Sequence, residues 1–275
     1  MIGLEIEFWK LHGNGNDFIL VDECERQVIP DEMKAQFAGL YCDRRFGIGG
    51  DGVLYLSRSG QADLHMRLFQ PDESEAEMCG NGIRCFVKYA FDAGYVKNTC
   101  LVESLTGIIK VEMAYADDMF MATLDMPEPR FERKDIPATG DGEYREEIAG
   151  KVVYAVNTGV PHAVIFVDDI DAVSLPELGP VIRHHQTFPK GANVNIVQRA
   201  GENTLRIRTF ERGIEGETLS CGTGATAAAA VARKLGYVTT PVTVETPGGS
   251  LVISFGDVTR TKGPATTVFK GSLIF

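Results

Sequence analysis

The sequence predicts an α+β protein built of two similar domains, each a curled, mainly antiparallel β-sheet around one central helix. Two observations carry this prediction. A segment of the chain recurs with a spacing of 142 residues, and both copies place short β-like runs around a single helix-like run. With 275 residues the chain is long enough for two domains of ordinary size. We therefore expect an N-terminal domain at 1–123, to which a C-terminal strand at 265–275 returns, and a C-terminal domain at 124–264.

The repeat is clearest at two cysteines. The segment CGNGIRCFVKYAFDAGYV begins at Cys79, and CGTGATAAAAVARKLGYV begins at Cys221. Both run Cys-Gly-x-Gly, continue as a helix-like run and end in Gly-Tyr-Val. An Arg-x-Phe motif and a glutamate precede each cysteine. Because this pattern and its end signal recur at the same distance, we interpret the two halves as products of an internal duplication.

The β-like runs of the first half lie at 18–22, 53–57, 64–69, 107–114 and 121–126. In the second half the corresponding runs are VVYAV, HAVIFV, NVNIVQ, LRIRTF and LVISF. Gly, Pro and Asp bound these runs, which predicts hairpins rather than βαβ crossovers.

Two helix-like runs, 83–93 and 225–235, are apolar or small on nearly every side, which predicts helices that are buried all round. Each is followed by a glycine of the kind that ends helices. One further helix, from about Asp31 to Tyr41, is expected on the surface of the first domain, because Pro30 and Asp31 mark its start.

Composition excludes several functional classes. The net charge of −11 counts against a nucleic-acid partner, since such proteins need clustered Lys and Arg. No run is long and apolar enough to predict a membrane span. The six cysteines show no CxxC spacing, so we expect neither a metal site nor a disulfide framework. Free cysteines are typical of a reducing compartment, so we expect a cytoplasmic location. The GIGGDG stretch at 47–52 precedes a strand-like run, so we expect no dinucleotide cofactor there.

The residues around each cysteine predict an anion site. Each cysteine stands where a loop leads into a helix, so the next backbone N–H groups are unpaired and point outward with the positive end of the helix dipole. Glycines there let a carboxylate approach Gly80-Asn81 and Gly222-Thr223 closely. The same field lowers the pKa of a thiol from its free value of about 8.5.

Two such cysteines in duplicated domains suggest one reaction. If the domains face each other about a pseudo-twofold axis, one thiolate can take the α-proton from one face of a carbon beside a carboxylate, and the other thiol can return a proton to the opposite face. The converging N–H groups would stabilise the charge that builds on the carboxylate. Alternatives remain: a redox-active disulfide between Cys79 and Cys221, or a non-enzymatic binding protein on the same fold.

At these positions the sequence resembles the diaminopimelate epimerases, which interconvert LL- and meso-diaminopimelate in lysine and peptidoglycan precursor synthesis without pyridoxal phosphate. The resemblance covers nearly the whole chain. It is carried, in this order, by KLHGNGNDF, RRFGIGGDG, SEAEMCGNGIRC, TGVPH, GANVN, FERGIEGETLSCGTG and PGGSL. It implies a cofactor-independent isomerase with no metal, and it is compatible with a homodimer.

The resemblance also implies roles for individual residues. Cys79 and Cys221 would be the two acid/base residues, with His162 and Glu211 beside them tuning their protonation. Substrate would be bound by the α-carboxylate residues Gly80, Asn81, Gly222 and Thr223, by Asn16 in the pocket wall, by Glu211 beside the cysteines, and at the distal end by Gln70, Asn193 and Arg212.

The distal end departs from the family pattern. Gln70 and Val160 stand where the family usually has asparagines. Arg212 has a physical argument of its own, because a planar guanidinium binds a second carboxylate through two hydrogen bonds. Because Gln70 and Val160 depart from the family pattern, a racemase of another amino acid, such as histidine, is the nearest alternative.

Overall fold

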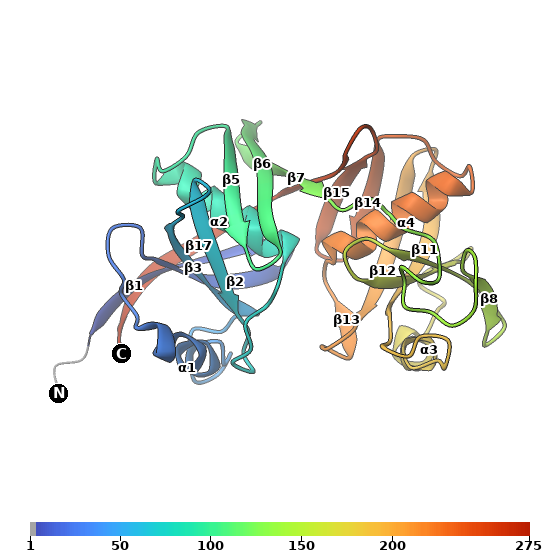
Figure 1. Ribbon diagram of the computed structural model, residues 1–275, viewed down its shortest axis with the longest axis horizontal. Helices are drawn as coiled ribbons and strands as arrows, with labels where there is room; N and C mark the ends of the chain where they lie inside the picture. Colours follow the sequence, from blue (N-terminus) through green and yellow to red (C-terminus); the bar gives the residue numbers. More distant parts are fainter. Residues whose placement is uncertain (1–3) are drawn as a thin grey trace. The chain divides into compact units, whose positions relative to one another are not determined.

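The computed structural model describes residues 4–275. The chain forms two compact units: the first comprises the residues up to Leu124 together with Gly263–Phe275, and the second comprises Asp125–Lys262. The boundaries expected from the sequence were 123/124 and 264/265, against 124/125 and 262/263 in the structure. Four helices and seventeen strands occur in the described residues, which confirms the predicted α+β class (Figure 1).

The first unit contains ten elements. In chain order they are β1 (Glu5–Gly13), β2 (Asn16–Asp22), α1 (Asp31–Tyr41), β3 (Gly52–Arg58), β4 (Leu64–Phe69), α2 (Gly80–Asp92), β5 (Thr99–Ser104), β6 (Gly107–Ala116), β7 (Met119–Met126) and, from the end of the chain, β17 (Thr266–Ile274). Strand β17 pairs with β1 in antiparallel fashion, so the C-terminal strand completes the sheet that the N-terminal strand begins.

The second unit is one continuous stretch of chain. Its elements are β8 (Arg145–Ile148), β9 (Lys151–Asn157), β10 (Pro161–Phe166), α3 (Leu175–Arg183), β11 (Asn193–Gly201), β12 (Thr204–Glu211), β13 (Gly216–Thr218), α4 (Gly222–Lys234), β14 (Val242–Thr246), β15 (Gly249–Ser254) and β16 (Thr259–Pro264). Strands β7 and β16 each run across the boundary between the units.

A buried helix lies at the centre of each unit, as predicted (Figure 1). Helix α2 contacts strands β1, β2, β3, β4, β6 and β17, and α4 contacts β9, β10, β11, β12, β14 and β15. Residues 81–90 of α2 and 224–232 of α4 are all buried. The alanine-rich sequence of α4 lets six strands approach one helix closely, because small side chains leave the helix surface narrow.

Strand pairing shows the duplication directly. In the β3–β4 hairpin Val53 pairs with Phe69, and in the β11–β12 hairpin Val194 pairs with Phe210. Val194 lies 141 residues after Val53, and Phe210 lies 141 residues after Phe69, so the two hairpins have the same register. The cysteines that follow therefore leave equivalent strands and enter equivalent helices.

The expectation of hairpins in place of crossovers is wrong for four strand pairs. The pairs β2–β3, β4–β5, β10–β11 and β12–β14 are parallel, and each connection contains one of the four helices. Helix α3 was not expected; it occupies the place in the second unit that α1 has in the first. Its sequence, LPELGPVIR, has two prolines and a glycine in nine residues, which masks the helical pattern. None of the helices in the described chain has the length and apolar character needed to cross a membrane.

Candidate active site

Cys79 is the N-cap residue of α2, with extended backbone angles. Its sulfur accepts a hydrogen bond from the backbone N–H of Gly82 at 3.4 Å, and its thiol lies 3.5 Å from the amide oxygen of Asn16. A Cβ placed on Gly80 would have no neighbour within 4 Å. The first turn of α2 therefore offers open space beside the thiol, where a carboxylate could reach the backbone N–H groups.

A relay of amides connects Cys79 to a buried arginine. The Asn81 side-chain nitrogen donates to the Asn16 oxygen at 3.1 Å, and the Arg84 guanidinium donates to the Asn81 oxygen at 2.6 Å. Arg84 also donates to the carbonyl of Pro264 at 3.1 Å. Each amide thus has its orientation fixed from both ends, so Asn16 and Asn81 are held rigidly beside Cys79.

Four charged groups surround the other side of Asn16. Its amide nitrogen donates to Asp51 at 2.6 Å. Asp51 is paired with Arg44, and Asp17 is paired with both Arg44 and Lys10. Burial raises the pKa of Asp17, but hydrogen bonds from Arg44 and Lys10 outweigh it and hold that pKa at about 2. The two anions and two cations balance, so this cluster orients Asn16 without adding net charge.

Cys221 is the N-cap residue of α4 and, unlike Cys79, makes no side-chain capping bond to the helix. Its sulfur lies 3.4 Å from the hydroxyl of Thr223. A Cβ on Gly222 would meet nothing within 4 Å, whereas one on Gly224 would lie 2.5 Å from the Asn195 amide oxygen and 3.3 Å from the Cys221 sulfur. Gly222 therefore borders open space, and Gly224 lets Asn195 approach the cysteine.

His162 belongs to a buried polar network behind Cys221. Its Nδ1 lies 3.0 Å from the Asn195 side-chain nitrogen and its Nε2 3.5 Å from that of Asn193. The Asn195 oxygen accepts from Thr209 at 3.0 Å. Burial, with a smaller contribution from the positive charge of Arg212, lowers the pKa of His162 to about 3. His162 is therefore a neutral side chain with one acceptor nitrogen. The shorter contact assigns that acceptor to Nδ1, which holds the Asn195 amide.

The residues expected at the distal end differ in their surroundings. The backbone N–H of Arg212 donates to the Asn193 oxygen at 2.7 Å, and its guanidinium donates only to the carbonyl of Lys190 at 3.4 Å. Glu211 accepts from the Thr218 hydroxyl at 2.9 Å. Gln70 is exposed and accepts from the Ser74 hydroxyl at 3.1 Å. Arg212 thus keeps donors for a carboxylate, while Asn193 holds its backbone in place.

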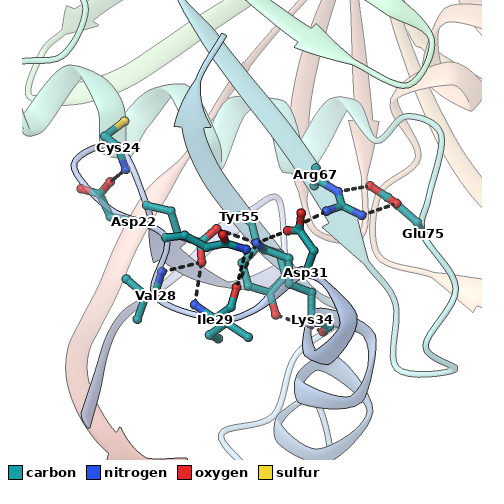
Figure 2. A network of polar contacts seen from close by, with 11 residues as sticks. Asp22, Cys24, Val28, Ile29, Asp31, Lys34, Tyr55, Arg67 and Glu75 are labelled. Atoms are coloured by element: carbon teal, nitrogen blue, oxygen red, sulfur yellow. Dashed lines mark hydrogen bonds and ion pairs between the residues drawn. The ribbon is translucent and has the colours of Figure 1, made fainter. Parts of the chain in front are cut away.

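An arginine–glutamate pair braces the chain before each cysteine. Arg67 binds both carboxylate oxygens of Glu75 at 2.7 and 2.9 Å, as Figure 2 shows. Arg208 binds both oxygens of Glu217 at 2.7 Å. Each glutamate lies four residues before its cysteine. A bidentate pair fixes direction as well as distance, so the duplication has kept a device that anchors each loop to a strand.

Arg67 extends its brace to the surface helix. It also contacts Asp31 at 3.2 Å, and Asp31 pairs with Lys34, which pairs with Glu23 (Figure 2). The first turn of α1 is thereby tied to the strand that precedes the Cys79 loop.

The remaining cysteines are surrounded differently. Cys24, Cys42, Cys85 and Cys100 are free thiols. Cys42, Cys85 and Cys100 are buried, and burial raises the pKa of Cys42 and of Cys100 to about 12. No group of three His, Cys, Asp or Glu side chains within residues 4–275 is arranged to hold a metal ion. Only the two N-cap cysteines therefore combine a helix start with open space.

Comparison with known proteins identifies the family. The family model for diaminopimelate epimerase matches residues 8–131 and 154–272. The chain belongs to the diaminopimelate epimerase family. A diaminopimelate epimerase from Methanocella arvoryzae is 55% identical over 98% of this chain and 97% of its own length, and one from Archaeoglobus fulgidus is 45% identical over 98% and 97%. The resemblance found in the sequence is confirmed.

Solved structures extend the likeness of the epimerase fold to distant proteins. A phenazine biosynthesis protein from Bacillus anthracis superposes with a TM-score of 0.74 at 15% identity, covering 98% of this chain and 99% of that one. A hydroxyproline epimerase from Agrobacterium vitis gives 0.71 at 17% identity, covering 98% and 93%. At such identities the likeness shows the fold alone.

The structure adds site residues that sequence reasoning missed. Asn195, Thr209, Asp51 and Arg84 all enter the networks around the two cysteines. Asn195 and Asp51 lie in stretches that carry the family resemblance, but nothing in their spacing distinguishes them from turn residues. Arg84 could have been noticed, because it is a charged residue in a helix predicted to be buried all round.

Proposed function

We propose that this protein is a cofactor-independent epimerase that interconverts LL- and meso-diaminopimelate by two-base proton transfer between Cys79, Cys221 and the α-carbon. One observation carries the proposal within its family: both cysteines are N-caps of buried helices whose first glycine faces open space. Lysine biosynthesis is the pathway that this activity serves.

In the proposed reaction, one cysteine as thiolate removes the α-proton and becomes a thiol. The other cysteine, as thiol, donates its proton to the opposite face of the carbanion and becomes a thiolate. The α-carboxylate rests on the N–H groups at Gly80-Asn81 and Gly222-Thr223, where two helix dipoles stabilise the charge that develops on it. The mechanism requires both helix starts to reach the same α-carbon.

His162 and Glu211 are proposed to act on Cys221 rather than on substrate protons. The neutral His162 positions Asn195, whose oxygen lies beside Gly224 at the helix start. Asn16 plays the corresponding part for Cys79, because its oxygen contacts the thiol. In each unit an asparagine therefore lies at the start of the central helix, Asn16 against Cys79 and Asn195 against Gly224, and each is held by further hydrogen bonds.

Arg212 is proposed to select substrates that carry a second carboxylate. Its guanidinium has one weak carbonyl contact, so a substrate carboxylate would supply the strong partners. Asn193, Glu211 and Gln70 are proposed to bind the substrate together with Arg212. An amino acid without a distal carboxylate would leave the guanidinium unpaired, which lowers its kcat/KM relative to diaminopimelate.

We further propose a cytoplasmic enzyme that acts on a free amino acid, with neither nucleic acid nor membrane as a partner. Sedimentation equilibrium would decide between a monomer and a homodimer.

The two-base mechanism is tested by isotope exchange. In D₂O the enzyme should introduce deuterium at the α-carbon of LL-diaminopimelate, and Cys79→Ala and Cys221→Ala should each abolish epimerisation. Normal turnover by either variant would contradict the mechanism. Cys85→Ala is the matched control, because this third thiol is buried and faces no open space.

The redox alternative makes the opposite prediction about oxidation. A confirmed disulfide between Cys79 and Cys221 should abolish epimerisation, and a reductant should restore it. Full activity in the disulfide-bonded sample would contradict the two-base mechanism.

Substrate choice separates the epimerase from a racemase of another amino acid. LL-diaminopimelate, L-histidine, L-glutamate and L-lysine should be compared with the wild type and with Arg212→Met. We expect activity on diaminopimelate and a fall of about 100-fold in kcat/KM for Arg212→Met. Undiminished activity on L-lysine or L-histidine would refute the role of Arg212.

A further inference from the structure

The two helix starts differ in one buried charge. Arg84 is 1% exposed and is the largest fully buried side chain among residues 4–275. Its hydrogen-bond acceptors, Asn81 and Pro264, are both neutral, and no carboxylate in the described residues forms an ion pair with it. An uncompensated cation in a protein interior is costly, because hydration is lost and no opposite charge replaces it.

The position of Arg84 directs its charge toward Cys79. It lies five residues into the helix that Cys79 caps, and long side chains on a helix point back toward the N-terminus. The contact with the Asn81 oxygen shows that the guanidinium does so here. Cys79 and Cys85 are the ionisable groups that interact with it, and Cys85 is fully buried.

The other charged groups around Cys79 do not cancel this cation. On β1, β2 and the following loops, Lys10, Asp17, Arg44 and Asp51 pair with one another and carry no net charge. Before Cys79, Arg67 pairs with Glu75, and Glu77 is exposed to solvent. The Asn16 oxygen favours a protonated Cys79, but at 3.5 Å it is a weak neutral acceptor. A full buried charge and the N–H of Gly82 act in the other direction and outweigh it.

The equivalent position in the second unit is neutral. Thr226 is the residue equivalent to Arg84 in the repeat. The buried hydroxyl of Thr226 donates to the Gly222 carbonyl at 2.9 Å and lies 2.9 Å from the Thr261 hydroxyl. On β10, β12 and the loop after it, His162 is neutral, and Glu211 and Arg212 carry opposite charges. The other charged groups there are paired: Arg206 with Asp171, Arg208 with Glu217, and Glu215 with Arg183.

We infer that Arg84 is a positioning residue that places negative charge on Cys79, so that the resting enzyme holds Cys79 as the thiolate and Cys221 as the thiol. This inference rests on the proposed two-base function and adds to it a direction. From the resting state Cys79 removes the α-proton and Cys221 supplies the new one. After that turnover Cys79 carries a proton and Cys221 has lost one, and exchange with water restores the resting state.

The experiment measures the acidity of each cysteine without substrate. Alkylation by iodoacetamide is followed from pH 5 to 10, reading Cys79 in the Cys221→Ala protein and Cys221 in the Cys79→Ala protein. Peptide mass spectrometry assigns the modified thiol. We expect the midpoint for Cys79 to lie at least one pH unit below that for Cys221, which is about tenfold in thiolate fraction at low pH.

Variants at the two equivalent positions test the cause. Arg84→Met should raise the midpoint for Cys79 by about one unit or more, and Arg84→Lys should keep most of the effect because it keeps the charge. Thr226→Val is the matched variant at the equivalent position and should leave the midpoint for Cys221 unchanged. Arg84→Met should fold, since an apolar residue of similar length can replace a buried charge.

Two results would overturn the inference. One is a Cys79 midpoint equal to or above that of Cys221 in otherwise unchanged protein, a comparison that needs no Arg84 variant. The other is an unchanged Cys79 midpoint in Arg84→Met. Alkylation requires no turnover, so a failure here is distinguishable from a failure of the isotope-exchange test of the proposed function.

Discussion

His162 shows how one buried residue couples stability to pH. It is fully buried, and burial, with a smaller contribution from the charge of Arg212, favours its neutral form. Its folded pKa of about 3 lies below the unfolded value of about 6.5. The unfolded chain therefore binds a proton that the folded protein does not, so the contribution of His162 is fully present above pH 6.5 and declines as the pH falls toward 3.

This linkage predicts a specific loss of stability in mild acid. Between pH 7.5 and pH 5, His162 should lower the free energy of unfolding by about 2 kcal/mol. His162→Gln keeps an acceptor for Asn195 but does not titrate, so its urea denaturation should lose that part of the pH dependence. Carboxylates with lowered pKa, such as Asp17, lose their contribution only below about pH 4 and leave this window clear. Parallel curves for wild type and variant would contradict the assignment.

Among the elements, the starts of α2 and α4 carry the proposed active site, and the first two glycines of α4 have different surroundings. A Cβ on Gly222 meets nothing within 4 Å, whereas one on Gly224 collides with the Asn195 oxygen at 2.5 Å. Neither glycine has a positive φ, so alanine is compatible with both backbones. The difference between the two substitutions therefore comes from space alone.

The two substitutions should separate stability from activity. Gly224→Ala should destabilise the protein by about 1–3 kcal/mol through overpacking. Gly222→Ala should change stability by about 1 kcal/mol or less yet lower kcat/KM by about 100-fold, because the methyl group occupies the proposed carboxylate position. Thermal melts and steady-state kinetics of both variants provide the check. A fully active Gly222→Ala would remove the carboxylate from this helix start.

Elements with a clear period and punctuation were predictable from the sequence, and the others were not. The α1 helix and the β4 strand match their expected ranges, and both buried helices were expected because apolar or small residues cover nearly all their faces. The parallel pairings were missed, since strand direction depends on which edge the chain returns to and not on local composition. The expected site residues came from the repeat and the family motifs, whereas Asn195 and Thr209 contact the site only through the register of β11 and β12.

At the scale of the whole molecule, duplication has kept the frame and changed the charges. Both units have the same strand register, a central helix that begins directly after a cysteine, and an arginine–glutamate pair before that cysteine. They differ at two positions of the repeat. Thr226 is the equivalent of Arg84. His162 on β10 is the equivalent of Phe18 on β2, since the two residues pair with equivalent positions of the next strand. Equivalent geometry with unequal electrostatics is what a reaction using one thiolate and one thiol requires.

The units also differ in how the chain builds them, which predicts different folding of the separated parts. The second unit is continuous from Asp125 to Lys262 and has its own core around α4 and a second core cluster that includes the buried face of α3. The first unit needs β17, which pairs with β1 along most of its length. A fragment of residues 125–262 should unfold cooperatively in urea, whereas a fragment of residues 1–124 should not, because β1 would then be an unpaired edge beside an open core.

Adding a peptide of residues 263–275 should restore amide protection in the fragment of residues 1–124. A peptide with Gly271→Asp is the matched control, since a Cβ there would lie 2.9 Å from Phe8. Cooperative unfolding of the 1–124 fragment without the peptide would show that β17 is dispensable for the first unit.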